Sequence, residues 1–131
     1  MIARIVFLGI VFVLSLRATA AETSIPATIE FNRDVRPILS EHCFVCHGPD
    51  ANRREAELRL DTQAGLTGHG SDVKPVVPGK PQASVLLRRI TSNDPEQQMP
   101  PPSAGKRPSP REIAILQQWI EQGANWQGHW A

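Results

Sequence analysis

Two cysteines, separated by two residues and followed directly by a histidine, most constrain this chain: Cys43-Phe44-Val45-Cys46-His47. Thiols at this spacing can both add across the two vinyl groups of one porphyrin, and the adjoining histidine can then bind the iron as an axial ligand. A C-x-x-C pair alone is ambiguous between a redox dithiol, half of a zinc site and coincidence, and His47 removes much of that ambiguity. The sequence contains no other cysteine. The motif therefore predicts one covalent haem c, attached through Cys43 and Cys46.

The N-terminus predicts export. Residues 1–4 carry one positive charge, residues 5–16 are almost entirely apolar, and Ala18-Thr19-Ala20 provides the small residues of a signal-peptidase site. The apolar run has about a dozen residues, whereas a membrane-spanning helix needs about 20. We therefore expect a signal peptide over residues 1–21, a periplasmic mature protein and no stable membrane span after cleavage. The alternative is an uncleaved N-terminal anchor, which Arg17 beside the cleavage site favours.

The predicted mature chain has room for one small domain and carries little net charge. About 110 residues remain after cleavage, and the loss of Arg4 and Arg17 leaves 12 basic against 13 acidic residues. No basic stripe is present, so we expect no nucleic-acid partner. The mature chain has no tyrosine and only two phenylalanines, Phe31 and Phe44, so the protein-only core is thin, and we expect the haem-free form to fold poorly. Residues 22–30 are expected to be a polar lead-in to one domain over residues 31–131.

Apolar residues at helical spacing predict a small α domain. The first helix is expected to present both cysteines at its C-terminal end and to stop at Gly48-Pro49, with Pro37 in its first turn. The last helix is the best defined, because Ser109 and Glu112 form a capping box around Pro110 and Gly123 follows as a stop. The expected helical ranges are 31–44, 62–66, 83–90 and the segment from Pro110 to Gly123.

The connections between these helices are expected to be long and rich in proline. Residues 73–81 contain three prolines and are predicted to be extended, and residues 94–108 are predicted to be a loop. Leu58-Arg59-Leu60 alternates in polarity and is predicted to be a short strand.

The iron would need a second axial ligand, and Met99 is the first candidate. It is the methionine that remains after loss of Met1, and it lies in a rigid Met-Pro-Pro-Pro run that would hold a thioether at the iron with little ordering cost. The alternative is that Met99 fills a gap in the core. Three histidines are rival ligands: His42, expected on a helix surface, His69, expected in an exposed loop between glycines, and His129, near the end of the chain.

Other residues are expected to support the haem site or the fold around it. His47 needs a hydrogen-bond acceptor for its other ring nitrogen, and we expect the carbonyl of Pro75 to supply it. Trp119 is expected in the core, whereas Trp126 and Trp130 lie beyond the last helix and are expected either to form a docking surface or to mark a missing neighbour. Candidate partners for the haem propionates, or otherwise solvated charges, are Arg53, Arg54, Arg59, Arg88 and Arg89.

Several segments of the chain resemble the planctomycete-type cytochrome c domain. They are Phe31–Leu39 leading into Cys43–Asp50, Leu58–Asp61, Val77–Gly79, Met99–Pro101, Glu112–Leu116 and Trp119–Ala124. The resemblance covers residues 31–131. It implies an all-α, class I-like cytochrome fold in which an N-terminal and a C-terminal helix cross near one haem, with His47 and Met99 as the axial pair. In that family the domain usually begins a much longer protein, so we expect either a free-standing version or a truncated one.

The favoured function is that of an electron carrier rather than an enzyme, with one haem iron cycling between Fe(III) and Fe(II). It would pass single electrons between redox partner proteins in the periplasm or to a neighbouring domain. Two alternatives stay open. One is a haem enzyme or sensor, which requires an open iron site without Met99. The other is a thiol–disulfide oxidoreductase that uses Cys43 and Cys46, and it predicts alternating strands and helices.

Overall fold

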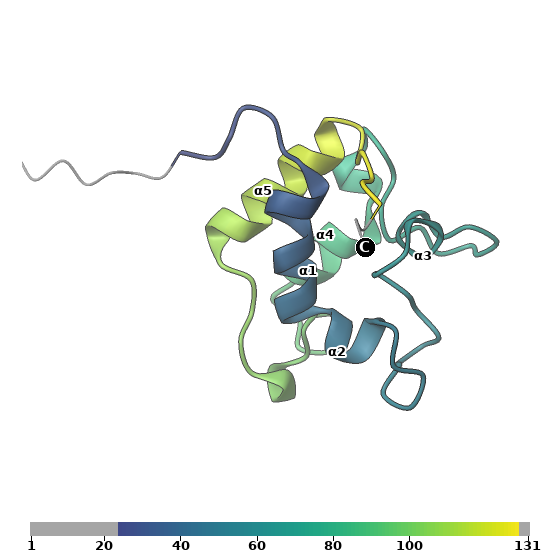
Figure 1. Cartoon of the computed structure of the whole chain (residues 1–131). Helices are drawn as coiled ribbons and strands as arrows, with labels where there is room; N and C mark the ends of the chain where they lie inside the picture. Colours follow the sequence, from purple (N-terminus) through teal and green to yellow (C-terminus); the bar gives the residue numbers. More distant parts are fainter. Residues whose placement is uncertain (1–23, 129–131) are drawn as a thin grey trace, which may run out of the picture.

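The computed structural model describes residues 24–128, and this part of the chain is built from helices without any strand (Figure 1). The predicted signal peptide, His129 and Trp130 lie outside the described residues. No helix between residues 24 and 128 is long and apolar enough to cross a membrane. In chain order the elements are η1 (Phe31–Val35), α1 (Arg36–His42), α2 (Phe44–His47), α3 (Gln63–Thr67), η2 (Pro81–Ala83), α4 (Val85–Thr91), η3 (Pro102–Ala104) and α5 (Pro110–Glu121).

The last helix, α5, forms where the sequence predicts it. The Ser109 hydroxyl accepts a hydrogen bond from the backbone N–H of Glu112, and the Glu112 carboxylate accepts one from the backbone N–H of Ser109. This capping box satisfies N–H groups that have no partner within the helix. The chain leaves the helix through Gly123, whose φ of 102° belongs to the left-handed region that favours glycine.

The predicted first helix is divided into a π-helical turn, an α-helix and a separate last turn. Arg36 donates its N–H to the Phe31 carbonyl, five residues back, and the following Pro37 has no N–H to donate. The α-helix then ends at Cys43, whose backbone leaves helical geometry with φ −125° and ψ −39°. The chain changes direction at this residue, so α2 lies at an angle to α1 (Figure 1).

The core lies between the first helical segment, α4 and α5. In Figure 1, η1 crosses α5 and α4 lies behind, and both η1 and α4 contact α5. The rings of Phe31 and Trp119, both almost fully buried, have centroids 5.5 Å apart and join η1 to α5. Trp119 is therefore a core residue, as predicted. The other large buried side chains include Leu39, Leu66, Ile90, Leu116 and Ile120.

The segment after α5 folds back onto the first helix, which corrects the expectation that Trp126 forms an exposed docking surface. The centroids of the Trp126 and Phe31 rings are 4.2 Å apart, and the Arg36 guanidinium lies over both rings. The backbone N–H of Asn32 also donates to the Gln127 side chain at 2.8 Å. Burial of the indole against Phe31 removes apolar surface from water and offers the cation a π face.

Two segments outside the helices are held by specific contacts. The backbone N–H of Ile29 donates to the side chain of Gln122, directly after α5, at 2.9 Å, and Ile29 is part of the core. The predicted strand at Leu58–Leu60 is wrong, because this segment forms turns without ladder partners. It passes so close to α3 that a β-carbon at Gly65 would lie 1.7 Å from the carbonyl oxygen of Arg59. The apolar alternation there reflects Leu60 packing into the core from a loop.

Candidate functional site

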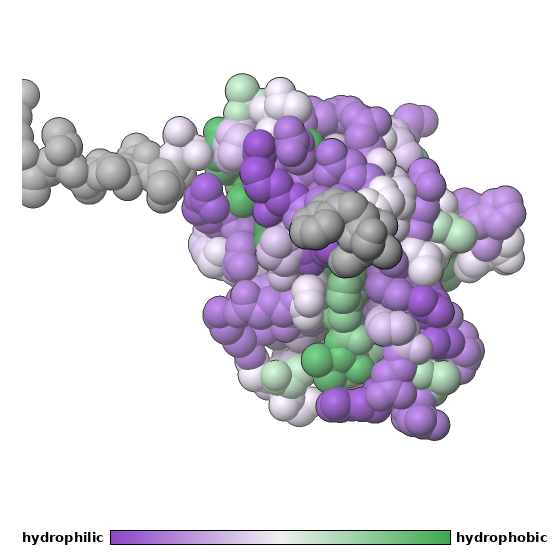
Figure 2. All heavy atoms as spheres, in the orientation of Figure 1, coloured by the Kyte–Doolittle hydropathy of each residue, from purple (hydrophilic) through white to green (hydrophobic). Residues whose placement is uncertain are grey.

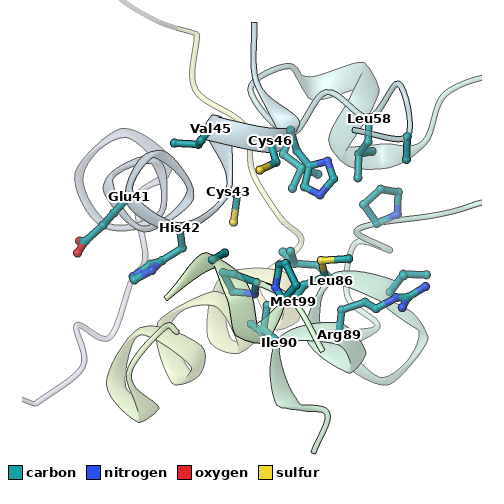
Figure 3. A pocket seen from close by; sticks show the side chains of 18 of the residues that line it. Glu41, His42, Cys43, Val45, Cys46, Leu58, Leu86, Arg89, Ile90 and Met99 are labelled. Atoms are coloured by element: carbon teal, nitrogen blue, oxygen red, sulfur yellow. The ribbon is translucent and has the colours of Figure 1, made fainter. Parts of the chain in front are cut away.

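A cavity of about 570 Å³ lies between the Cys43–His47 segment and the wall formed by α4 and the loop around Met99 (Figure 3). This volume is in the range of roughly 300–1,000 Å³ that small-molecule and cofactor sites occupy. Four sequence-predicted site residues line it: Cys43, Cys46, His47 and Met99. Its remaining lining is largely apolar and includes Leu58, Leu60, Pro75, Val85, Leu86, Ile90, Pro100 and Pro101.

The two thiols reach the cavity because Cys43 to His47 forms a single helical turn. The Cys43 carbonyl accepts hydrogen bonds from the N–H of Cys46 at 3.2 Å and from the N–H of His47 at 2.8 Å. Side chains three positions apart on a helix share a face, so both sulfur atoms lie toward the same space (Figure 3). Gly48 ends the turn, and a β-carbon there would lie 2.2 Å from the Phe44 carbonyl oxygen.

His47 has a hydrogen-bond partner that differs from the predicted one. Its Nδ1 lies 3.2 Å from the carbonyl oxygen of Glu55, whereas the Pro75 carbonyl accepts the N–H of Leu86 at 2.9 Å. The expectation for Pro75 is therefore corrected to Glu55. A carbonyl oxygen can only accept, so Nδ1 must carry the proton, and Nε2 is left with its lone pair free for a metal.

Met99 lies on the opposite wall, at the start of a proline run. Its backbone N–H donates to the Arg89 carbonyl at 3.0 Å, which fixes the loop to α4. The peptide bond to Pro100 is cis, and Pro100 itself is buried. In Figure 3 the Met99 thioether lies near Leu86 and across the cavity from Cys43 and Cys46. The fold thus brings a soft sulfur ligand opposite the attachment motif.

The two rival histidines within the described residues, His42 and His69, differ in their surroundings. His42 was expected on the helix surface, and this is wrong, because its side chain is 1% exposed and lines the cavity. Its Nε2 lies 3.3 Å from a carboxylate oxygen of Glu112. His69 is exposed in its loop as expected and does not line the cavity. His129 lies outside the described residues.

Among the five arginines considered for the haem propionates, Arg89 lines the cavity. Arg59 is engaged by Asp61 in two short hydrogen bonds of 2.7 and 2.6 Å, and Arg54 donates to the carbonyls of Gly48 and Pro49. Arg53 and Arg88 are exposed away from it. Lys106 also lines the cavity and was missed by the sequence analysis, since nothing local distinguishes it from a solvated lysine.

Both cysteines are free thiols, and burial governs the chemistry of the first. Burial, with a smaller contribution from the neighbouring Cys46, raises the pKa of Cys43 to about 12. A thiol with so high a pKa is protonated at neutral pH and is a poor redox nucleophile. Residues 24–128 also lack the strands that a thiol–disulfide oxidoreductase fold requires.

A group of three potential metal ligands, Glu41, His42 and Glu112, lies at the edge of the cavity, with its donor atoms within 4.8 Å of one another. Each of these side chains already has a partner. Glu41 accepts from Lys106 at 2.5 Å, His42 contacts Glu112, and Glu112 also accepts from Ser109. Each of the three side chains thus has a hydrogen-bond partner within the protein, and the group forms a hydrogen-bonded network.

Comparison with known proteins gives one result. Residues 43–103 match the family model described as Planctomycete cytochrome C. The matched segment begins at Cys43 and extends past Met99. It does not include η1, α1 or α5, so it is shorter than the resemblance over residues 31–131. No curated protein and no solved structure matches the chain.

Proposed function

We propose that this chain is an electron carrier with one covalent haem c, because residues 43–103 match the family model described as Planctomycete cytochrome C. One observation carries the proposal: a single cavity of cofactor size has two free thiols and His47 on one wall and Met99 on the other. When bound, the haem supplies an iron that gains and loses one electron.

Cys43 and Cys46 hold the group covalently in this proposal. Each thiol would add across one vinyl group: the S–H bond and the vinyl π bond break while an S–C bond and a C–H bond form, so no atom or electron is lost. The single helical turn between the two residues supports it, since both sulfur atoms lie toward the same space. Both residues must reach this step as reduced thiols.

His47 and Met99 are proposed as the axial ligands. The hydrogen bond from Nδ1 to Glu55 orients the imidazole and leaves Nε2 available, and the Met99–Arg89 backbone bond holds the thioether loop on α4. A thioether opposite a histidine raises the reduction potential and fills the coordination sphere. Leu86 and Ile90 give the cavity an apolar lining, which would keep water from the bound group and so favour electron transfer over ligand binding.

Export and redox partners complete the proposal. The predicted signal peptide would deliver the chain to the periplasm, where partner proteins or a neighbouring domain would exchange electrons with it. Val45 and Val73 support a partner contact, because they are large apolar side chains, 52% and 54% exposed, that both line the cavity. Figure 2 shows an apolar strip beside α2 on an otherwise largely hydrophilic face.

The test is expression of the full-length chain in a host that matures c-type cytochromes. The pyridine haemochrome spectrum should be that of two thioether links, and it should change to one link in Cys43→Ala or Cys46→Ala. The ferric protein should show a methionine–iron charge-transfer band that disappears in Met99→Ala. The matched control is His69→Ala, an exposed histidine away from the cavity, which should leave both spectra unchanged.

Different failures point to different alternatives. A chain without haem but with two titratable thiols would contradict the cytochrome and favour the dithiol oxidoreductase. A haem protein whose spectrum is the same in Met99→Ala would contradict Met99 ligation and favour an open iron site, as in a haem enzyme or sensor.

A further inference from the structure

Two consecutive residues before Cys43 bond to the segment that follows Met99. Glu41 accepts from Lys106 at 2.5 Å, and His42 lies 3.3 Å from Glu112, a contact between residues 70 positions apart. His42 and Lys106 both line the cavity. These contacts therefore join the wall that carries the thiols to the chain that leads away from the thioether.

The two contacts differ in strength because their exposure differs. The side chains of Lys106 and Glu41 are 72% and 51% exposed, and ion pairs of this kind contribute little in water. The side chains of His42 and Glu112 are 1% and 22% exposed. A buried hydrogen bond to a carboxylate is among the stronger ones, and its loss leaves a buried polar group without a partner.

Glu112 is itself fixed on the α5 side. Its second carboxylate oxygen accepts the backbone N–H of Ser109 at 2.7 Å, within the capping box. The segment between Met99 and Ser109 is tied to α4 as well, since Arg107 donates to the carbonyls of Ile90 and Ser92 at 2.8 and 3.0 Å. His42 thus contacts a rigid unit and not a free side chain.

We propose that His42 is a positioning residue, which holds the Met99 loop at a fixed distance from the haem-attachment turn through Glu112. The inference rests on the proposed haem site. The iron–thioether bond closes a ring between the two walls, and its strength depends on the effective concentration of the sulfur at the iron. The His42–Glu112 contact joins the same two walls and raises that effective concentration. Its loss should therefore let an external ligand displace Met99 from the iron.

The experiment titrates imidazole into the ferric full-length holoprotein. Loss of the methionine–iron charge-transfer band reports the binding. His42→Leu should bind imidazole about tenfold more tightly than the natural chain, because a buried hydrogen bond to a charged group is lost. His42→Gln, whose amide can still donate to Glu112, should stay close to the natural chain. His69→Leu is the matched control, and it should not change the affinity.

A second pair of variants separates positioning from helix stability. Ser109→Ala and Glu112→Ala both break the capping box, but only Glu112→Ala removes the partner of His42. Imidazole affinity should therefore rise in Glu112→Ala and stay near the natural value in Ser109→Ala. If His42→Leu does not yield holoprotein, the comparison of Ser109→Ala with Glu112→Ala still tests whether the His42–Glu112 contact positions Met99.

The inference is overturned if haem is attached and imidazole affinity in His42→Leu equals that of the natural chain. Equal effects of Ser109→Ala and Glu112→Ala overturn it too. Failure of the proposed function has a different appearance: either the natural chain carries no haem, or Met99→Ala has the same imidazole affinity as the natural chain. Both of those outcomes overturn the inference with it.

Discussion

The indole of Trp126 packs on the ring of Phe31 with a centroid separation of 4.2 Å, so the end of the described chain covers its beginning. Arg36 lies over both rings, at 5.1 Å from Phe31 and 5.5 Å from Trp126. The C-terminal segment is therefore part of the fold that supports the attachment turn, because Arg36 begins the helix that ends at Cys43.

Replacement of Trp126 by Ala should lower the free energy of unfolding by about 2 kcal/mol. Full truncation of a buried Trp costs about 3–5 kcal/mol, and Trp126 is only half-buried. Denaturant unfolding of the holoprotein measures the change. Gln82→Ala, at an exposed site away from the cavity, should cost much less, and equal losses in the two variants would contradict the packing role.

Gly48→Ala should impair formation of the attachment turn. The added β-carbon would lie 2.2 Å from the Phe44 carbonyl oxygen, which is backbone and cannot rotate away. We expect a loss of about 2 kcal/mol and a lower yield of holoprotein. Gly128→Ala has open space around it and serves as the control. A normal haem yield in Gly48→Ala would show that the turn adopts another geometry during maturation.

The free energy of unfolding should decrease in acid, because the folded protein favours the ionised form of several carboxylates. The hydrogen bond from Arg59 holds the pKa of Asp61 below its ordinary value of 3.8, and the one from Arg33 does the same for Asp34. Burial raises the pKa of Glu112, but hydrogen bonds from Ser109 and His42 outweigh it, and the net pKa is below 4.5. A lowered pKa means that the stabilisation is complete above the ordinary value and is lost as pH falls through the folded-state value.

The free energy of unfolding of the holoprotein, measured from pH 6 down to pH 2, should therefore decrease below about pH 4. Asp61→Asn should make this decrease shallower, since one of the contributing carboxylates is gone. Asp72→Asn, at an exposed site, is the control. An acid transition as steep in Asp61→Asn as in the natural chain would contradict the role of the Arg59–Asp61 pair.

The haem-free chain should fold poorly. Without haem, the largely apolar lining of the cavity of about 570 Å³ would be left without an apolar partner, and a domain of this size has little other core to compensate. A Cys43→Ala/Cys46→Ala variant should unfold without a cooperative thermal transition. Calorimetry of this variant beside the holoprotein is the measurement, and a sharp cooperative transition in the haem-free chain would contradict the expectation.

Helix α5 and the Cys43–His47 turn show what could be predicted from local sequence. The capping box needs only Ser109, Pro110 and Glu112, which are near neighbours in the chain. The thiols share a face because a helical turn places residues three apart together. Leu58–Leu60 shows the limit of the same reasoning, because alternating polarity fits a loop that buries one leucine as well as it fits a strand.

The sequence by itself determined the attachment motif, the capped last helix and the planctomycete-type cytochrome c resemblance, because each depends on residues close together in the chain. Only the tertiary structure decided that Met99 faces the two thiols, that Glu55 and not Pro75 contacts His47, and that His42 is buried against Glu112. These contacts form where distant segments cross. No local periodicity encodes such a crossing, since it depends on how the whole core packs.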